Sequence, residues 1–212
     1  MPFLEAHARL LLVVHTALAV GAVAASTHVV VWMRRYPRGD YARHDGVRRL
    51  SLYAALLFVG AFVAGNLMYP TYRVRVRAAY LEDGGALMRE RELRAQAHAR
   101  AVDRYDQEHA RGGGEPLPAV AEPGPEVPDA GATLPRRGAR MARWFDVKEH
   151  WLALGLVMAV AVAALARLWD PRRAGAAIAP AAFALAVGAA ATAWLGAIVG
   201  VLVSSWRAVG PL

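Results

Sequence analysis

Four long apolar segments, separated by arginine-rich stretches, constrain this chain more than any other feature of its sequence. A helix needs about 20 residues to cross a bilayer core of about 30 Å, and each segment is long enough. We place the segments at about Leu10–Met33, Leu50–Tyr69, His150–Trp169 and Ala176–Trp206. The sequence therefore predicts an all-α integral membrane protein, a bundle of four transmembrane helices.

The composition excludes two other classes of protein. Apolar residues make up 57% of the chain and charged residues 20%, whereas soluble domains have about 45–50% and about 25%. This excess of apolar residues excludes an ordinary soluble enzyme, and it also excludes a disordered chain. The net charge is +8, but the basic residues flank the spans. We therefore attribute them to membrane topology and expect no nucleic-acid partner.

Arginines in the short connections predict the orientation of the spans. Positive residues concentrate in cytoplasmic loops. The connection between the first two spans and the connection between the last two carry Arg34, Arg35, Arg38, Arg43, Arg48, Arg49, Arg167, Arg172 and Arg173. We expect both connections to be cytoplasmic, in a bacterial inner membrane. Both termini and the long middle segment are then extracytoplasmic.

The middle segment, 70–148, separates a first helix pair, 1–69, from a second pair, 149–212. Its composition predicts two parts. Residues from about 86 to 110 are rich in Arg, Glu and Ala and favour a charged helix. Residues 111–138 are rich in Gly and Pro and are typical of a flexible linker. We therefore expect this extracytoplasmic segment to be partly disordered.

Histidines carry the candidate chemistry, because the chain has no cysteine. That absence excludes disulfides, iron–sulfur clusters and thioether-linked haem, so a metal or haem iron must be held by other side chains. His15 and His28 lie inside the first span, where ionisable residues are costly and usually functional. They lie about 20 Å apart along the helix axis and point about 140° apart around it. His44, His98 and His109 are expected to be solvated.

A second group of side chains is expected at the extracytoplasmic ends of the spans. Glu5 and His7 precede the first span, and Glu149 and His150 begin the third. Together with His15, the residues His7, Glu149 and His150 form a ligand set suited to Zn, Cu or Fe. His150 also lies on the same side of the membrane as His15, so these two histidines can form the outer ligand pair of a haem. Helix capping and interfacial anchoring are the alternative roles for Glu149 and His150.

These histidines lead to two hypotheses. The arrangement of spans is similar to that of small four-helix b-type cytochromes and haem-bearing membrane anchors of respiratory enzymes, a likeness of architecture that covers only the spans. It implies a subunit of an electron-transfer complex that binds haem b through His15, His28 and His150, or otherwise Zn, Cu or Fe through His7, His15, Glu149 and His150. The alternative is a non-catalytic scaffold or assembly subunit that binds a periplasmic or membrane partner, with the outer segment holding a periplasmic partner and the histidines forming hydrogen bonds between helices. In either case we expect no stand-alone enzyme.

Small residues and the lack of other charges complete the expectations for the spans. Gly196–Gly200 is a GxxxG pattern, and Ala61–Gly65 and Gly21–Ala25 are similar small-residue pairs. Such pairs let helices approach closely, so we expect a packed bundle whose partners are lipids and either other membrane subunits or further copies of the chain. We expect the first three spans to bury no Asp, Glu, Lys or Arg. Neither a proton-pumping relay nor a voltage sensor is expected.

Overall fold

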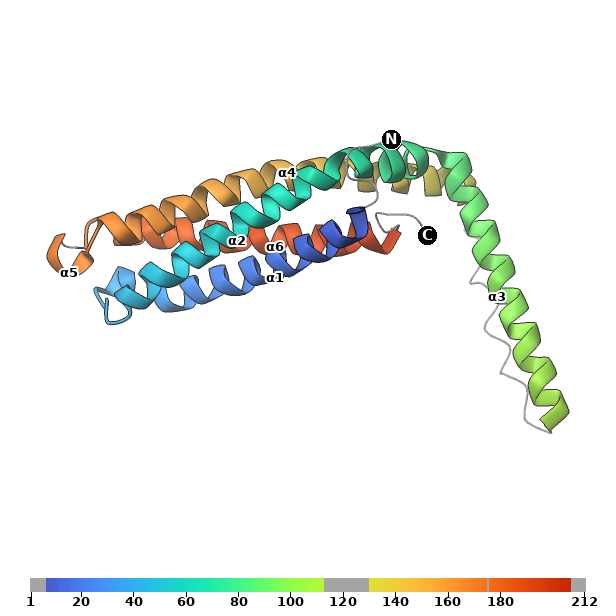
Figure 1. The fold of residues 1–212 in the computed structure, drawn as a ribbon, viewed down its shortest axis with the longest axis horizontal. Coiled ribbons are helices and arrows are strands. Elements are labelled where there is room, and N and C mark those ends of the chain that lie inside the picture. Colours follow the sequence, from blue (N-terminus) through green and yellow to red (C-terminus); the bar gives the residue numbers. More distant parts are fainter. Residues whose placement is uncertain (1–6, 113–129, 175, 207–212) are drawn as a thin grey trace. The chain divides into compact units, whose positions relative to one another are not determined.

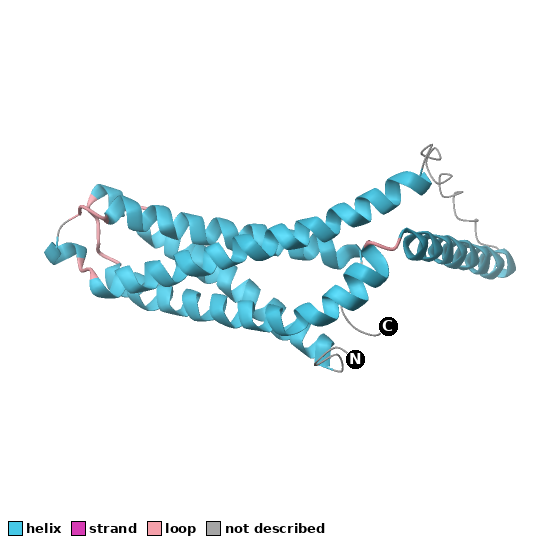
Figure 2. Cartoon of the chain, turned by 90° about the horizontal axis from the view of Figure 1, so that it is seen from above, coloured by secondary structure: helices cyan, strands magenta, loops and turns pink. Residues whose placement is uncertain are grey.

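Long helices dominate this computed structural model, which describes residues 7–112, 130–174 and 176–206. The four longest apolar helices lie side by side (Figure 1); they are α1 (Ala8–Met33), α2 (His44–Thr71), α4 (Ala130–Leu168) and α6 (Ala179–Trp206). The other elements are the 3-10 helix η2 (Tyr36–Arg38), the π-helix η3 (Tyr72–Leu81), α3 (Gly84–Gly112) and α5 (Pro171–Ala174). Within the described ranges only helices and loops occur (Figure 2).

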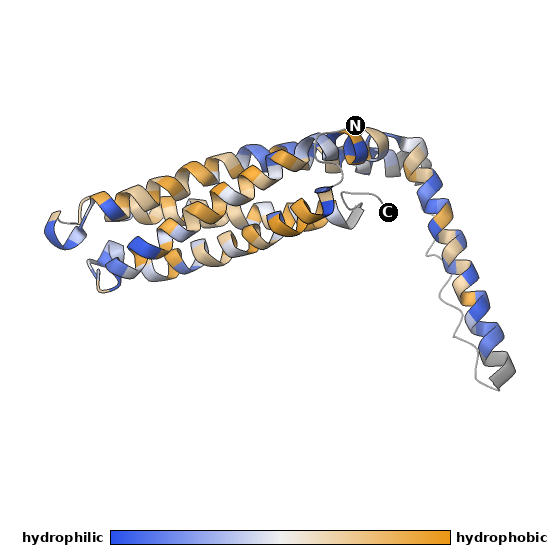
Figure 3. Ribbon diagram, viewed as in Figure 1, coloured by the Kyte–Doolittle hydropathy of each residue, from blue (hydrophilic) through white to orange (hydrophobic). Residues whose placement is uncertain are grey.

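Each of the four bundle helices is long and apolar enough to cross a membrane. Apolar residues predominate along the four bundle helices, and hydrophilic residues are frequent in α3 and at the ends of the bundle (Figure 3). The prediction of an all-α bundle of four transmembrane helices is confirmed, and the chain is a multi-pass membrane protein. We call the end with the two short connections the loop end. The end at which α1 begins and α6 finishes is the terminal end.

Small residues allow the bundle helices to pack closely. A Cβ at Gly155 of α4 would overlap the hydroxyl of Thr192 on α6, and a Cβ at Gly196 would lie 2.6 Å from Leu152 Cδ2. The buried residues around this contact come from all four helices, and most of them are alanine: Ala22, Phe58, Ala159, Ala189 and Ala193. Contact between helices in lipid depends on this close packing, since apolar side chains gain little by leaving lipid for protein.

The second bundle helix does not end at the position predicted from its proline. Pro70 lies inside α2, and the chain continues as η3 to Leu81. Proline removes a backbone donor and clashes with the preceding turn, so helices often kink or widen near it. A π-helix absorbs such a disruption through longer-range bonds, as in the 2.9 Å bond from Glu82 N to Arg77 O.

The chain divides into two units, with boundaries after residues 76 and 142. The smaller unit, 77–142, contains α3, and this helix covers the predicted charged segment. The part of α4 in this unit begins at Ala130, so residues 130–138 are helical where a linker was expected. In this helical stretch Gly138 packs closely against the end of η3, where a Cβ at position 138 would lie only 2.6 Å from Leu81 O. Linker residues 113–129 lie outside the described residues.

The larger unit contains both predicted helix pairs, 1–69 and 149–212, in one bundle. Its core at the loop end joins α1 and α2 to α4 and α6 through buried residues: Val29, Met33, Tyr36, Val47, Val162, Ala166, Ala179, Ala182 and Ala186. The two sequence pairs therefore share one hydrophobic core.

Candidate functional site

His15 connects the first two helices of the bundle. Its Nδ1 lies 2.8 Å from the backbone oxygen of Ala61, and its ring lies against Gly65, where a Cβ would be 3.3 Å from the ring carbon Cε1. A carbonyl only accepts hydrogen bonds, so Nδ1 is the protonated nitrogen, and Nε2 of the neutral ring is then an acceptor. The small-residue pair predicted in the second span thus provides both a partner and space for this imidazole.

His28 and His150 have a different environment. Each Nδ1 lies 2.8 Å from the carbonyl oxygen four residues earlier in its own helix, at Ala24 and Asp146 respectively. Both side chains are exposed on the surface of the chain. In His15, His28 and His150, Nδ1 is thus bound to a backbone carbonyl, so Nε2 is the nitrogen left for a ligand.

The predicted metal ligands do not form a cluster within the described part of the chain. There, no group of three or more His, Cys, Asp or Glu side chains could hold a metal ion. His7 is exposed just before α1 and makes no capping bond with its side chain, and Glu149 is half-buried on α4. Glu5 lies outside the described residues.

A buried lysine is the main feature that the sequence analysis missed. Lys148, the single lysine of the chain, is only 8% exposed. It lies on α4, two residues before the predicted start of the third span near His150, so the expectation that the first three spans bury no charged side chain is not contradicted. The helix that contains it begins at Ala130, about 20 residues before His150.

Residues of α4 and α6 lie close to the Lys148 ammonium group. Nζ lies 4.9 Å from the centre of the Phe145 ring and would be 3.7 Å from a Cβ at Gly200 of α6. The charge of Lys148 also interacts electrostatically with His15 of α1 and with the neighbouring Glu149. Within the described residues, no hydrogen-bond acceptor and no carboxylate within ion-pair distance is found for Nζ.

Three aromatic rings lie next to this lysine at the terminal end. Phe145 stacks on Tyr72 at a centroid distance of 3.8 Å and an interplanar angle of 18°. Tyr69 is also nearly parallel to Phe145, with an angle of 19° and a centroid distance of 6.3 Å. Lys148 thus lies beside a stack of rings contributed by α2, η3 and α4. We refer to His15, Lys148, Tyr69, Tyr72 and Phe145 as the lysine cluster.

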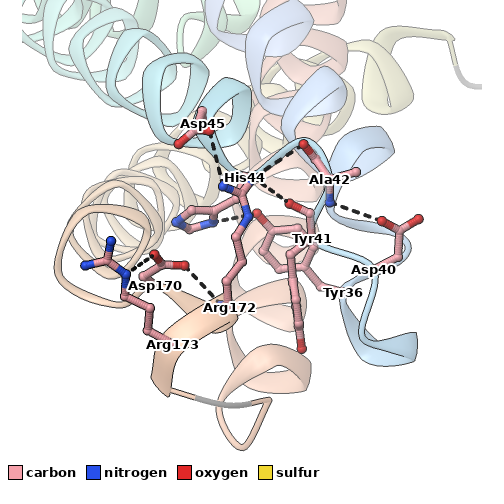
Figure 4. Close-up of polar contacts among 9 residues, drawn as sticks. All are labelled: Tyr36, Asp40, Tyr41, Ala42, His44, Asp45, Asp170, Arg172 and Arg173. Carbon is pink, nitrogen blue, oxygen red and sulfur yellow. Dashed lines mark hydrogen bonds and ion pairs between the residues drawn. The ribbon is translucent and has the colours of Figure 1, made fainter.

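A second polar cluster closes the loop end (Figure 4). The Tyr36 hydroxyl lies 2.9 Å from His44 Nδ1, and both residues are buried. The Tyr36 ring also meets Tyr41 edge-on at 5.1 Å and Trp169 at 6.5 Å. The expectation that His44 is solvated is therefore wrong. It was based on the loop position of this residue, whereas His44 is the first residue of α2 and faces Tyr36.

Arg172 joins the two short connections at the loop end. Its guanidinium lies 3.4 Å from Asp45 Oδ2 and donates to the backbone oxygens of Tyr41, at 3.1 Å, and Ala42, at 3.4 Å. The neighbouring Asp170 accepts from the Arg172 backbone N–H at 3.0 Å. Arginine suits this position because it presents several donors in one plane. All of these bonds join groups of the protein itself, so the role of this cluster is to stabilise the loop end.

A small cavity lies inside the bundle. A cavity of about 10 Å³ lies between residues of all four helices, among them Ser26, Ser51, Ala159 and Ala189. This volume is enough for about one water molecule, whereas ligand pockets usually measure about 300–1,000 Å³. This cavity is too small for a porphyrin.

Comparison with protein-family models, with curated proteins and with solved structures finds no significant match to this chain.

Proposed function

We propose that the chain is a membrane-embedded subunit of a respiratory-type electron-transfer complex. In this proposal it holds haem b, or otherwise a metal ion, on the outer surface of α1 together with a second polypeptide. The observation that carries the proposal is the exposure of His28, which lies within a membrane-crossing helix.

An imidazole that faces hydrocarbon is unfavourable. Ionisable residues in membrane spans nearly always face a bundle interior, a cavity or a partner. His28 lies five residues before the end of α1, which is about 8 Å along the helix axis. A protein or cofactor that covers this part of α1 would remove the imidazole from contact with lipid.

The hydrogen bond of His28 also suits a ligand role. Metal-binding histidines nearly always donate their second ring N–H to a carbonyl, a carboxylate or water, which fixes the ring and its tautomer. The bond from Nδ1 to Ala24 O has this form, so Nε2 could bind iron. His150 has the same arrangement with Asp146 O, and it would serve a site at the terminal end of α4.

His15 is less suited to a metal than the sequence analysis expected. The ammonium of Lys148 interacts with it electrostatically and would repel a metal cation. We therefore assign the haem or metal to His28 first and to His150 second. In this proposal the arginine-rich loop end lies in the cytoplasm of a bacterium, and the terminal end and 77–142 are extracytoplasmic.

Absorption spectra of the purified complex test this proposal. The wild-type protein, isolated in mild detergent with its natural partners, is expected to show a Soret band and sharp α and β bands after reduction. His28→Ala should remove this haem signal or an equivalent content of metal, whereas His98→Ala, which changes an exposed histidine of α3, should not. A colourless, metal-free complex would refute the proposal.

A scaffold role is the second candidate, and the surface of α3 favours it. Residues 91–101 of this helix are all exposed, including Leu93, which is 63% exposed. Exposed polar helices of this kind can bind a partner through a few apolar anchors. Leu93→Glu would then release a partner from the native complex in size-exclusion chromatography, whereas Glu92→Gln would not. An unchanged complex with the Leu93→Glu variant would count against this role for α3.

A further inference from the structure

Arginines outnumber carboxylates at the loop end. Residues 34–49 and 167–173 contain nine arginines and three aspartates, and all twelve belong to the described part of the chain. Each aspartate forms an ion pair with one arginine: Asp40 with Arg35, Asp45 with Arg172 and Asp170 with Arg173. The other six arginines form no ion pair with a described residue, and all six are exposed: Arg34, Arg38, Arg43, Arg48, Arg49 and Arg167. The described residues thus leave an excess of positive charge at this end of the bundle.

Arg43 has a defined place at the contact between α1 and α2. Its guanidinium carbon lies 5.9 Å from the centre of the Trp32 ring, and a Cβ at Gly46 would lie 2.9 Å from the same ring. Trp32 of α1 therefore packs over Gly46 of α2 and carries Arg43 on its ring. Tryptophan is enriched where membrane helices meet the lipid headgroups, so this contact lies at headgroup depth.

Arg49 begins an exposed strip on α2. Tyr53 and Leu56 follow it at spacings of four and seven residues, which places the three side chains on one face of the helix. Arg49 is exposed, and Tyr53 and Leu56 are 59% and 56% exposed. The strip thus offers a cation, then a phenol and then an apolar side chain, which is the order of groups along a phospholipid from phosphate to acyl chain.

An anionic headgroup suits these side chains. Guanidinium groups bind phosphate oxygens through two parallel hydrogen bonds, and basic clusters beside a membrane helix attract anionic lipids. Asp45 lies one turn before Arg49 and would repel a phosphate, but its carboxylate is paired with Arg172 at 3.4 Å. Asp40 interacts electrostatically with Arg43, but it is already paired with Arg35.

We propose that Trp32, Arg43, Arg49 and Tyr53 form a headgroup site that binds one anionic phospholipid. The lipid phosphate accepts hydrogen bonds from Arg43 and Arg49, the glycerol region lies against Trp32 and Tyr53, and an acyl chain follows Leu56 along α2. The lipid lies on the outer surface of the bundle, so the site needs no internal cavity. The proposal is independent of the haem or metal assigned to His28.

Native mass spectrometry of the full chain in detergent micelles tests the headgroup site. The titration compares the binding of phosphatidylglycerol with that of phosphatidylcholine, whose choline cation offsets the phosphate charge. We expect phosphatidylglycerol to bind about tenfold more tightly, because two arginines face its net negative charge. Arg43→Gln/Arg49→Gln should lose this preference and keep the weak binding of phosphatidylcholine. Equal affinity of the wild type for both lipids, or an unchanged preference in this double variant, would overturn the proposal.

Arg35→Gln/Arg173→Gln is the matched control, because it also removes two positive charges from the loop end. Both of these arginines are paired with aspartates, so this variant should keep the preference for phosphatidylglycerol. An equal loss of preference in the two double variants would indicate a general attraction to the loop end and would reject the headgroup site.

A soluble competitor separates a lipid site from a site for a soluble phosphate compound. Glycerol 3-phosphate carries the same phosphate but has no acyl chain to lie along α2. At a concentration equal to that of phosphatidylglycerol it should not displace the lipid from the wild-type chain. Displacement at equal concentration would show that the strip below Arg49 contributes nothing and would overturn the assignment to a lipid.

Discussion

Gly155 of α4 faces Thr192 of α6 so closely that a side chain at position 155 would overlap the threonine hydroxyl. Thr192 is buried, and its hydroxyl donates at 2.8 Å to Ala189 O in its own helix. No side chain larger than hydrogen fits at position 155 unless one of the helices moves. This contact sets the distance between the last two spans.

Gly155→Ala is therefore expected to destabilise the bundle. Overpacking in a close-packed interior typically costs about 1–3 kcal/mol, and we expect a loss of this size in unfolding by SDS titration. Thr192→Ala in the same chain should restore part of the stability by making room for the added methyl group. Gly85→Ala, at an exposed position of α3, serves as the control. Equal stability of Gly155→Ala and the wild type would contradict the close contact.

The hydrogen bond from His15 to α2 should contribute to stability, unlike the bond of His150 within its own helix. Hydrogen bonds between membrane helices contribute about 0.6 kcal/mol on average and at most about 1.7 kcal/mol. His15→Ala should lower the free energy of unfolding of the cofactor-free protein by an amount in this range. His150→Ala should change it by less than about 0.5 kcal/mol. If both variants lose the same stability, the bond to Ala61 has no special role.

The buried pair of Tyr36 and His44 should show coupling in a double-mutant cycle. A net contribution of about 1 kcal/mol is usual for a protein hydrogen bond, and a buried partner left unsatisfied costs about 1–3 kcal/mol. Tyr36→Phe and His44→Ala should each destabilise the loop end, and the double variant should lose less than the sum. Strict additivity of the two losses would mean that the two side chains do not interact.

Arg172 and Arg173 form a matched pair for the loop end. Arg172 reaches Asp45 and two backbone oxygens of the other connection, whereas Arg173 pairs with Asp170 nearby in the sequence. Arg172→Ala should cost about 1 kcal/mol, and Arg173→Ala should cost less than half of this. Limited proteolysis near residue 40 should also become faster only in Arg172→Ala. A larger loss of stability in Arg173→Ala than in Arg172→Ala would exclude Arg172 as the link between the two connections.

The stability contributed by the loop between α1 and α2 should depend weakly on pH in the acid range. The backbone N–H of Ala42, followed by the side chain of Arg35, holds the pKa of the Asp40 carboxyl below its ordinary value of 3.8. A lowered pKa in the folded state means that the ionised group stabilises the fold above pH 3.8 and loses this effect as the pH falls below it.

Asp40→Asn removes the charge and so tests this dependence. The difference in unfolding midpoint between the wild type and Asp40→Asn should be constant near neutral pH and should shrink as the pH falls through the lowered pKa of Asp40. NMR titration of the Asp40 carboxyl measures the same pKa directly. A difference that grows as the pH falls would show that ionised Asp40 does not stabilise the fold.

Much of the fold could be predicted from the sequence, because the physical causes are local. Four apolar segments of sufficient length allow few structures other than membrane helices, since only helices and closed barrels satisfy the backbone in lipid. The charged helix was predicted from its composition, because Arg, Glu and Ala are strong helix formers. The ends of the helices were less predictable: Pro70 and the Gly/Pro-rich stretch suggested breaks, whereas packing of Gly138 against Leu81 accompanies a longer α4.

The candidate site depended on tertiary structure in a way that no local pattern reveals. The sequence identified His15 and His28 as residues inside a span and indicated that they point apart around the helix. Only the packing of four helices decides that His15 contacts Ala61, that His28 faces outward and that Lys148 is enclosed beside Phe145 and Gly200. Hydrophobicity determines which segments cross a membrane, but the fit of small and large side chains between helices determines which polar groups meet.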